Sequence, residues 1–330
     1  MIETIYIERN VLDHPRTRKI CERFPDARKI HCGRYTEIFN PKAQNFRLQK
    51  RKPSLILAEK FKNLVLPAPP GYGIGSQNNY YFSHMLNCLY DCRYCFLQGM
   101  YQSAHYVLFV NYEDFLKEIR EIAARKSCIQ PHFFSGYDCD SLAMDPITSF
   151  SGSFLDLFSE MPQALLEIRT KSTQVRSLLN REPIANCVVA FSFTPEPVSR
   201  ALEHKVPSIE RRINALSKLS AHGWPIGLRF DPMIYEDNYR PNYQELFGRI
   251  FSVVKESAIH SVSLGSFRLP GSFFRKIKRL YPREKMFAGP LELKGNQVSY
   301  KPVLETEMSL FCTEALMNHV PQHKIFHCNS

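Results

Sequence analysis

Long apolar runs are absent from this sequence of 330 residues. No stretch reaches the roughly 20 apolar residues that a membrane-spanning helix needs. The N-terminal segment MIETIYIERN also lacks a charged region followed by an apolar one. We therefore expect neither a membrane span nor a secretory signal, and we expect a cytoplasmic protein. Internal repeats and low-complexity tracts are absent too, and a hydrophobic content of 44% excludes wholesale disorder.

A regular cysteine framework is likewise absent. Seven of the ten cysteines are scattered, at positions 21, 32, 128, 139, 187, 312 and 328. This scatter indicates a reducing compartment rather than a disulfide scaffold, and most of these side chains are expected to be buried as small hydrophobic groups. Only three cysteines cluster. They are Cys88, Cys92 and Cys95, in the stretch CLYDCRYC.

Charge is distributed unevenly along the chain, whose net charge is +11. Residues 1–63 hold 15 Lys/Arg against 7 Asp/Glu, and residues 265–301 hold 9 against 2. Basic blocks of this size suit a polyanion such as nucleic acid. A solvated basic surface is the alternative interpretation.

The first 60 or so residues are expected to form a small lobe, with strands at 4–8 and 27–32, a helix at 14–24 and an apolar stretch at 55–58. Residues 66–79 are rich in Pro and Gly and are expected to form a linker or crossing loop. Strand-like and helix-like stretches then alternate. The expected strands are 80–83, 106–110, 131–135, 164–170, 187–193, 225–231 and 259–267. Two expected helices begin after the N-cap residues Asn111 and Ser208. Three more are expected at 147–161, 243–254 and 270–281.

This alternation predicts an α/β fold in which a parallel sheet is wound with helices, and six such units indicate a barrel or part of one. Chemistry in such a fold gathers at the C-terminal ends of the strands. The cysteine cluster follows the expected strand 80–83, so it lies at the predicted active end.

The spacing C-x3-C-x2-C offers three thiolates from one short loop. Structural zinc needs four ligands, usually from two pairs, and no second pair lies downstream. A redox pair formed by Cys92 and Cys95 leaves Cys88 unexplained, and plain packing is a further alternative. A [4Fe–4S] cluster has four irons, so three cysteines leave one iron open to a substrate or cofactor.

That spacing after the first barrel strand resembles the signature of the radical SAM superfamily. The resemblance implies that the open iron binds S-adenosylmethionine (SAM) and that an electron from the cluster releases a 5′-deoxyadenosyl radical. SAM needs partners for its charged methionine end and its ribose. Lys171 and Ser192, which end two expected strands, are our candidates, although either residue would be ordinary in isolation.

A narrower resemblance covers most of the chain and is to the spore photoproduct lyase family. It rests on IYIERNVLDHPRTRKI, CRYCFLQ, DSLAMDPIT, the pair Thr170–Lys171, the FSF at 191–193 and SFRLPGSFFRKIKRLYP. It implies a partial (β/α)6 barrel of the TIM type, with a small N-terminal α/β lobe and a C-terminal hairpin and helix. We expect domains at 1–75, 76–283 and 284–330.

The resemblance also implies a reaction, in which the radical abstracts hydrogen from a methylene-bridged thymine dimer in DNA and two thymines are restored. DNA and an external one-electron reductant such as flavodoxin or ferredoxin are the implied partners. Arg268 matches a family arginine near the lesion. A buried ion pair or a plain surface charge is the alternative role for Arg268.

The sequence departs from the family pattern in three places, of which the first is the hydrogen-donor position and the second is Phe96. Tyr137 stands where lyases carry the cysteine that returns a hydrogen atom, and Cys139 stands two residues later, where lyases carry a serine near SAM. Cys139 is therefore expected near SAM, and it acts as donor only if its loop is remodelled. Phe96 replaces a lyase tyrosine, whereas Tyr94, a candidate in the hydrogen-atom relay, is kept.

The third departure is the expected hairpin, FAGPLELKGNQVSYKP, which has only Lys294 and Lys301 where lyases carry a basic run. Three hypotheses follow. The chain is a lyase-like radical SAM enzyme acting on DNA photodamage, a radical SAM enzyme with another substrate, or a nucleic-acid-binding protein that keeps a cluster for structure.

Three further segments have modest roles. GYGIG at 71–75 lacks the strand-to-helix setting of a phosphate-binding loop and is expected to be a flexible crossing. Asp231 ends a strand, and a structural salt bridge is favoured over ligand contact. Met308, Phe311, Cys312 and Ala315 share one helical face, which indicates core packing.

Overall fold

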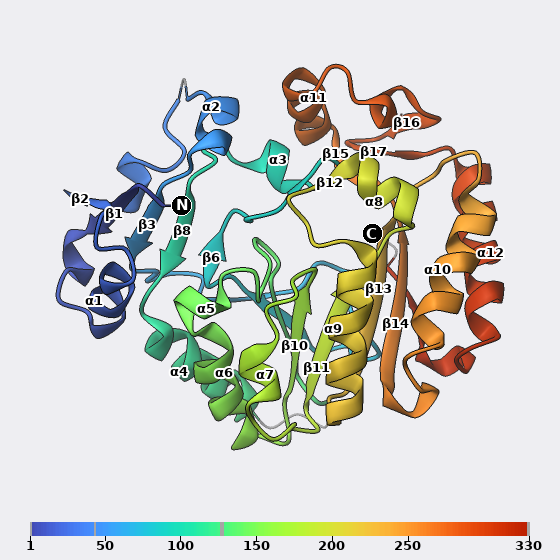
Figure 1. Ribbon diagram of the computed structural model, residues 1–330, viewed down its shortest axis with the longest axis horizontal. Helices are drawn as coiled ribbons and strands as arrows, with labels where there is room; N and C mark the ends of the chain where they lie inside the picture. Colours follow the sequence, from blue (N-terminus) through green and yellow to red (C-terminus); the bar gives the residue numbers. More distant parts are fainter. Residues whose placement is uncertain (1, 43, 126–128, 329–330) are drawn as a thin grey trace.

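The computed structural model describes residues 2–42, 44–125 and 129–328, so Cys128 lies outside the described residues. Two large sheets organise the chain (Figure 1). One has the strand order β2-β1-β3-β8-β6, and the other has the order β18-β14-β13-β11-β10-β9-β5-β4. No helix within the described ranges is long and apolar enough to cross a membrane.

The five-stranded sheet belongs to the N-terminal lobe, together with helices α1 (Pro15–Glu22) and α2 (Phe46–Arg51). Its strands are β2 (Arg28–Cys32), β1 (Thr4–Glu8), β3 (Leu55–Ala58), β8 (Tyr106–Phe109) and β6 (Met85–Leu86). All pair in parallel except β6 with β8. The strand expected at 106–110 is present as β8. The prediction that it belongs to the barrel was wrong, because it pairs with β3 in the lobe's sheet. Every residue of β3 and β8 is buried, so these two apolar strands pair in the middle of the lobe's sheet.

The larger sheet contains six adjacent parallel strands in chain order. They are β5 (Asn79–Phe82), β9 (His132–Ser135), β10 (Leu165–Thr170), β11 (Cys187–Ser192), β13 (Ile226–Met233) and β14 (Ile259–Ser266). The short strands β18 (Ile325–His327), parallel to β14, and β4 (Val65–Pro67), antiparallel to β5, extend its two edges. This curled sheet confirms the predicted partial (β/α)6 barrel.

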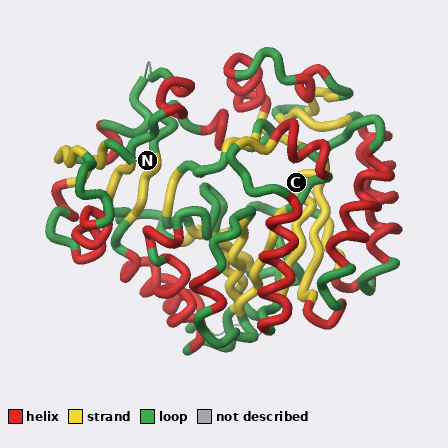
Figure 2. Tube along the Cα trace, in the orientation of Figure 1, coloured by secondary structure: helices red, strands yellow, loops and turns green. Residues whose placement is uncertain are grey.

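Helices cover the outer side of the larger sheet (Figure 2). They are α4 (Tyr112–Ala123), α5 (Asp145–Thr148), α6 (Phe150–Ser159), α7 (Arg176–Leu179), α9 (Ile209–His222), α10 (Tyr239–Phe251) and α12 (Pro302–Met317), whereas α8 (Glu196–Leu202) lies beyond the ends of the strands (Figure 1). Ser208 caps α9 as predicted, since its side chain accepts a hydrogen bond from the Arg211 amide. Asn111 is at the N-cap of α4 as predicted, but its side-chain oxygen accepts a hydrogen bond from the Lys60 amide and not from the helix.

The helix predicted at 147–161 is divided in two, because Ser149 adopts a left-handed conformation with φ of 52° between α5 and α6. The predicted C-terminal hairpin is present as β16 (Leu291–Lys294) and β17 (Gln297–Tyr300). A third strand, β15 (Arg268–Pro270), pairs with β17 and leads into helix α11 (Gly271–Leu280). On α12, Met308, Cys312 and Ala315 are buried and Phe311 packs partly against the core, as predicted.

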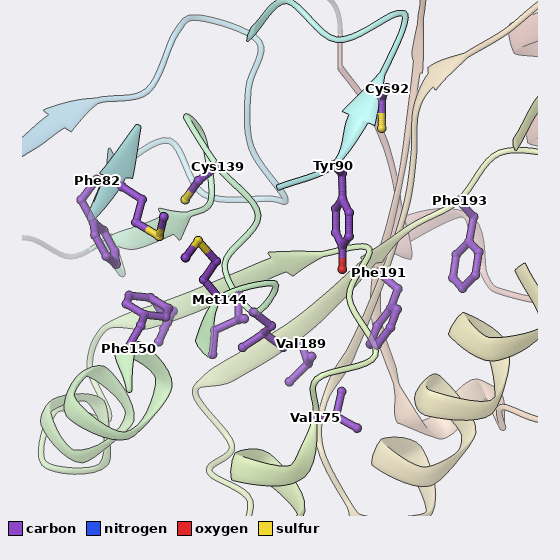
Figure 3. Close-up of a cluster of buried hydrophobic side chains, with 14 of the residues drawn as sticks. Phe82, Tyr90, Cys92, Cys139, Met144, Phe150, Val175, Val189, Phe191 and Phe193 are labelled. Atoms are coloured by element: carbon purple, nitrogen blue, oxygen red, sulfur yellow. The ribbon is translucent and has the colours of Figure 1, made fainter. Parts of the chain in front are cut away.

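One large hydrophobic core joins the lobe and the barrel, and part of it lies directly beneath the cysteine loop (Figure 3). The division at residues 75 and 283 stays a prediction. The lobe's sheet takes β6 and β8 from beyond residue 75, and the barrel sheet takes β4 from before it and β18 from beyond residue 283. The parts of the chain therefore interlock through shared sheets.

Candidate active site

A cavity of about 430 Å³ opens where the barrel strands end. Most of the candidate residues line it. They are Cys88, Cys92, Tyr94, Cys95, Tyr137, Cys139, Lys171, Ser192 and Arg268. These residues come from five separate segments of the chain, and the fold brings them to one space. Lys294 and Lys301 do not line the cavity.

The cysteine loop is held by a short strand pairing. Strand β7 (Asp91–Cys92) runs antiparallel to β12 (Glu203–His204), with Cys92 opposite Glu203. The Arg93 amide also donates to the carbonyl of Leu202 at 2.8 Å. The middle of the loop is therefore fixed to the segment that follows α8, which keeps the three cysteines on one wall of the cavity.

The three thiols are held in a poorly solvated place. Burial raises the pKa of Cys88 to about 12, raises that of Cys95, and raises that of Cys92 well above its usual range. The positive charges of Lys171 and Lys50 act on Cys95 in the opposite direction. Without a metal these thiols keep their protons, so metal binding must displace them.

The cysteines fit a multi-iron cluster better than a single ion. Cys88, Cys92 and Cys95 are all free thiols. Across the described ranges, no three His, Cys, Asp or Glu side chains converge closely enough to hold one metal ion. Zinc draws every sulfur ligand to about 2.3 Å from one point. A four-iron cube takes each thiolate at a different corner, so three cysteines that line one cavity without converging on a single point suit it.

Glu203 is the centre of a buried polar network behind the cysteine loop. Its carboxylate pairs with Arg212, and both side chains are fully buried. The same carboxylate accepts hydrogen bonds from the phenol of Tyr94 and from Ser199, the latter at 2.8 Å. The ammonium group of Lys171 lies 3.9 Å from it. Tyr94 and Lys171 are thus both oriented by one carboxylate.

Asp140 fixes the end of β10. Its carboxylate accepts hydrogen bonds from the Thr170 hydroxyl at 2.7 Å and from the Lys171 amide at 2.6 Å. On the next strand, the carbonyl of Ser192 accepts a hydrogen bond from Arg212 at 3.0 Å. The backbone positions of both SAM candidates, Lys171 and Ser192, are therefore set by buried charged groups.

Tyr137 belongs to an aromatic group in the cavity. Its ring centre lies 4.3 Å from that of Tyr81, 5.6 Å from that of Phe96 and 5.9 Å from that of Tyr72. The side chain is half-buried. Burial, followed by the influence of Tyr81, raises the pKa of its phenol, so the O–H bond is kept at neutral pH.

Cys139 is buried, and its loop is tightly held (Figure 3). Burial raises the pKa of its thiol well above the usual range, although the Met85 amide donates to the sulfur. The neighbouring Asp138 accepts from the Ser83 hydroxyl at 2.5 Å, and Asp140 is bound as described above. Both neighbours of Cys139 are thus anchored, which disfavours the remodelling that would let this thiol replace Tyr137 as donor.

Arg268 pairs with Asp231 at 3.0 Å and also donates to the Ser266 carbonyl at 2.9 Å. The salt bridge favoured for Asp231 is therefore present, at the cavity wall. The segment 71–75 leads to strand β5 and not to a helix, so it lacks the setting of a phosphate-binding loop. Its Tyr72 nevertheless lines the cavity.

Sequence reasoning missed several residues of this site. Tyr72 lies in a segment treated as a linker. Lys50 belongs to the N-terminal lobe, yet it lines the cavity and its ammonium lies 3.7 Å from Asp91. Glu203 and Arg212 carry no local signal, since neither stands at the end of a long strand. Asp140 alone had a usable signal, because it follows β9 closely.

Comparisons with known proteins agree with this geometry. The family model described as spore photoproduct lyase matches residues 73–301. The spore photoproduct lyase of Bacillus subtilis (strain 168) is 22% identical over 306 residues, covering 91% of this chain and 86% of the relative. The enzyme of the same name from Clostridium acetobutylicum is 22% identical, with coverage of 87% and 84%.

Solved structures share the fold. A spore photoproduct lyase variant with bound AdoMet and dinucleoside spore photoproduct has a TM-score of 0.86 at 16% identity, covering 100% of this chain and 98% of that one. A spore photoproduct lyase complexed with dinucleoside spore photoproduct has a TM-score of 0.84 at 17% identity, with the same coverage. Because the family model spans well over half of the sequence, the chain belongs to the spore photoproduct lyase family of radical SAM enzymes.

Proposed function

We propose that this protein is a radical SAM lyase that repairs methylene-bridged thymine dimers in DNA. One observation carries the proposal most strongly. The C-x3-C-x2-C cysteines and the two strand-end residues Lys171 and Ser192 line the same cavity, although they lie far apart in sequence. Relatives named spore photoproduct lyase, and a related structure with bound AdoMet and dinucleoside spore photoproduct, support the same activity.

Cys88, Cys92 and Cys95 would hold a [4Fe–4S] cluster. Bound there, the cluster would supply the one-electron reduction by which SAM is cleaved to a 5′-deoxyadenosyl radical. Flavodoxin or ferredoxin in the cytoplasm is the proposed one-electron donor. The chain's own contribution is to position the reactants and exclude water.

Lys171 and Ser192 would bind the methionine end of SAM. Lys171 is suited to a carboxylate because its ammonium is oriented by Glu203 while its amide is held by Asp140. Burial opposes the charge of Lys171, but the neighbouring Glu203 carboxylate favours it, and the pKa of the ammonium is raised overall. It therefore stays charged, and a SAM carboxylate would gain a charge-assisted hydrogen bond.

Tyr137 is the proposed hydrogen donor to the substrate radical, because it lies among the cavity aromatics while Cys139 is fixed beside the cysteine loop. The phenol would give up its O–H hydrogen, and the tyrosyl radical that remains would take one electron from flavodoxin or ferredoxin and one proton from solvent. Tyr94 is placed differently. Its hydroxyl hydrogen is directed to Glu203, so its proposed part in a relay requires proton transfer to that carboxylate.

A second candidate function is a radical SAM reaction on another lesion or another substrate. The aromatic wall formed by Tyr72, Phe96 and Tyr137 favours it, since a phenol stands where family members carry a thiol. Arg268, already paired with Asp231, would serve either substrate as a cation at the cavity wall.

The deciding experiment is anaerobic reconstitution of the full chain, with iron counted and 5′-deoxyadenosine measured, with and without ultraviolet-damaged DNA. Replacing Cys88, Cys92 or Cys95 by Ala should abolish iron binding and SAM cleavage. Cys139→Ala should retain iron, and Cys21→Ala, in the distant lobe, serves as the matched control. A wild-type protein that binds no iron–sulfur cluster would refute the proposal. SAM cleavage without thymine recovery would favour the second candidate.

A further inference from the structure

Two short basic helices border the cavity. Helix α2 has the sequence FRLQKR, and helix α11 has the sequence GSFFRKIKRL. Neither contains an acidic residue. In Figure 1 the two helices lie along the upper edge of the molecule, with α3 (Leu97–Met100) between them. They come from the two basic blocks of the sequence, so the fold brings together charge that is separated along the chain.

Each helix contributes an aromatic ring and a lysine in the same arrangement. Phe46 of α2 lines the cavity, and the Lys50 ammonium lies 5.8 Å from the centre of its ring. Phe273 of α11 lines the cavity, and the Lys276 ammonium lies 6.0 Å from the centre of its ring. These distances are within cation–π range. An apolar ring facing the cavity with a cation beside it is therefore repeated on both sides.

Helix α11 packs against α3, the segment that follows the cysteine loop. A Cβ atom on Gly99 of α3 would lie 2.7 Å from the Phe273 carbonyl oxygen, so α11 packs directly against α3. Tyr281, which ends α11, donates to Gln98 at 3.1 Å. Burial raises the pKa of Tyr281 to about 12, while Arg93 and Arg47 of α2 act against this rise.

The outward faces of both helices carry exposed cations. They are Arg47 and Arg51 on α2, and Arg275, Lys276, Lys278 and Arg279 on α11. The hairpin differs, because its Lys294 lies 3.8 Å from Glu292 and 3.5 Å from Glu305. A phosphate would have to compete with two carboxylates for that lysine. The helices therefore offer the stronger surface for a polyanion.

We propose that α2 and α11 form a two-sided clamp that binds the phosphates of a nucleic acid strand around the cavity mouth, in place of the hairpin. The inference rests on the proposed function, because it assumes that the cavity receives a base. A base-modifying enzyme must extrude its target from the stack, so the phosphates on either side of that base remain outside. Cations beside aromatic rings are the combination that binds exposed nucleotides, since the rings offer stacking and the charges neutralise phosphate.

The test measures binding of the full cluster-loaded chain to a short fluorescein-labelled duplex DNA by fluorescence anisotropy, between about 50 and about 200 mM salt. Four double variants each remove two positive charges. R47Q/R51Q alters α2, K276Q/R279Q alters α11, K294Q/K301Q alters the hairpin, and R211Q/K218Q alters the exposed side of α9 as a matched control. The substituted positions lie on helices, except Lys294 and Lys301 of the hairpin region. Circular dichroism of each variant checks that it is folded.

Each phosphate contact contributes about 0.9 to the slope of log affinity against log salt. We expect the α2 and α11 variants each to reduce the slope by about 1.8, whereas the hairpin and α9 variants keep it. A reduced slope in the hairpin variant alone, or an unchanged slope in both helix variants, would overturn the clamp. A third outcome would also overturn the clamp. In it, the helix variants bind DNA normally but cleave SAM more slowly than wild type when reduced flavodoxin supplies the electron, and at the wild-type rate when dithionite does. That result would identify the face as a protein-docking surface. Wild-type SAM cleavage, measured in parallel, tests the proposed function separately.

Discussion

The phenol of Tyr94 donates a hydrogen bond to the carboxylate of Glu203, although the two residues are 109 positions apart. The contact joins the cysteine loop to the strand that follows α8, and the backbones of Cys92 and Glu203 are paired in the same place. Since Glu203 also faces Lys171 and Arg212, one buried carboxylate orients both Tyr94 of the cysteine loop and Lys171 at the end of β10.

Replacing Glu203 by Ala should destabilise the protein strongly. The change would leave Arg212 fully buried without its carboxylate. Removing one partner of a buried ion pair costs about 3–5 kcal/mol. Urea unfolding followed by circular dichroism measures the loss, and Glu196→Ala is the control because its ion pairs with Arg200 and Arg249 lie at the surface. There the expected loss is below about 1 kcal/mol. Equal losses in the two variants would show that the network does not hold the loop.

Tyr137 should control product formation and not SAM cleavage. Tyr137→Phe keeps the ring but removes the hydrogen donor, so thymine recovered per SAM cleaved should fall by about tenfold. Tyr137→Cys supplies a thiol at the same place and should raise the yield above wild type. Both quantities are measured by chromatography of quenched reactions, with Tyr6→Phe, in the N-terminal lobe, as the control. Wild-type yields in Tyr137→Phe would assign the donor role elsewhere.

The barrel was predictable because its strands carry their own signal. The strands β10, β11 and β14 are buried over nearly their whole length, as expected for parallel strands covered on both faces, and β11 is apolar at five of its six positions. The same signal misplaced β8, since an apolar strand does not reveal which sheet it joins. Its partner β3 lies in the lobe, and that pairing depends on long-range contacts that periodicity does not encode.

The candidate site was predictable where family motifs reach it. The cysteines, Lys171 and Ser192 were found in this way, whereas Glu203 and Arg212 were not. Their pairing is a tertiary contact between a two-residue strand and α9. The ion pair of Lys294 could not be foreseen either, because Glu305 approaches it from the first turn of α12.

Gly99 should be intolerant of a side chain. A methyl group there would meet the backbone of Phe273 at 2.7–2.8 Å, and the nearest atoms are backbone atoms that cannot rotate away. Gly99→Ala should therefore push α11 from α3 and destabilise the chain by about 1–3 kcal/mol. Gly152→Ala is the control, because nothing lies within 4 Å of the added atom, inside helix α6. That variant should be more stable by about 0.5–1 kcal/mol. Thermal unfolding compares the two, and a neutral Gly99→Ala would contradict the close packing.

Glu167 should make the barrel sensitive to acid. It is fully buried in β10, and its carboxylate pairs with Arg229 at 2.7 Å and with Arg169 at 2.9 Å. Burial alone would raise the pKa of Glu167, but the two guanidinium groups outweigh it and lower the pKa from 4.5 to about 2. A lowered pKa in the folded state means that the stabilisation is complete above pH 4.5 and is lost as the pH falls toward 2.

The expected loss over that interval is about 3 kcal/mol, taking about 1.4 kcal/mol for each pH unit. Urea midpoints measured across the interval for wild type and for Glu167→Gln separate this residue from the other carboxylates. Those carboxylates titrate in both proteins, so only the difference between the two curves reports on Glu167. Glu167→Gln should be less stable near neutral pH, because the buried Arg229 and the partly buried Arg169 lose their counter-charge. The two curves should converge as the pH falls. Glu121→Gln, at an exposed position on α4, should run parallel to wild type throughout. If the curve of Glu167→Gln also ran parallel to that of wild type, the carboxylate of Glu167 would not stabilise the two guanidinium groups. The apolar packing of the strands alone would then hold this part of the barrel.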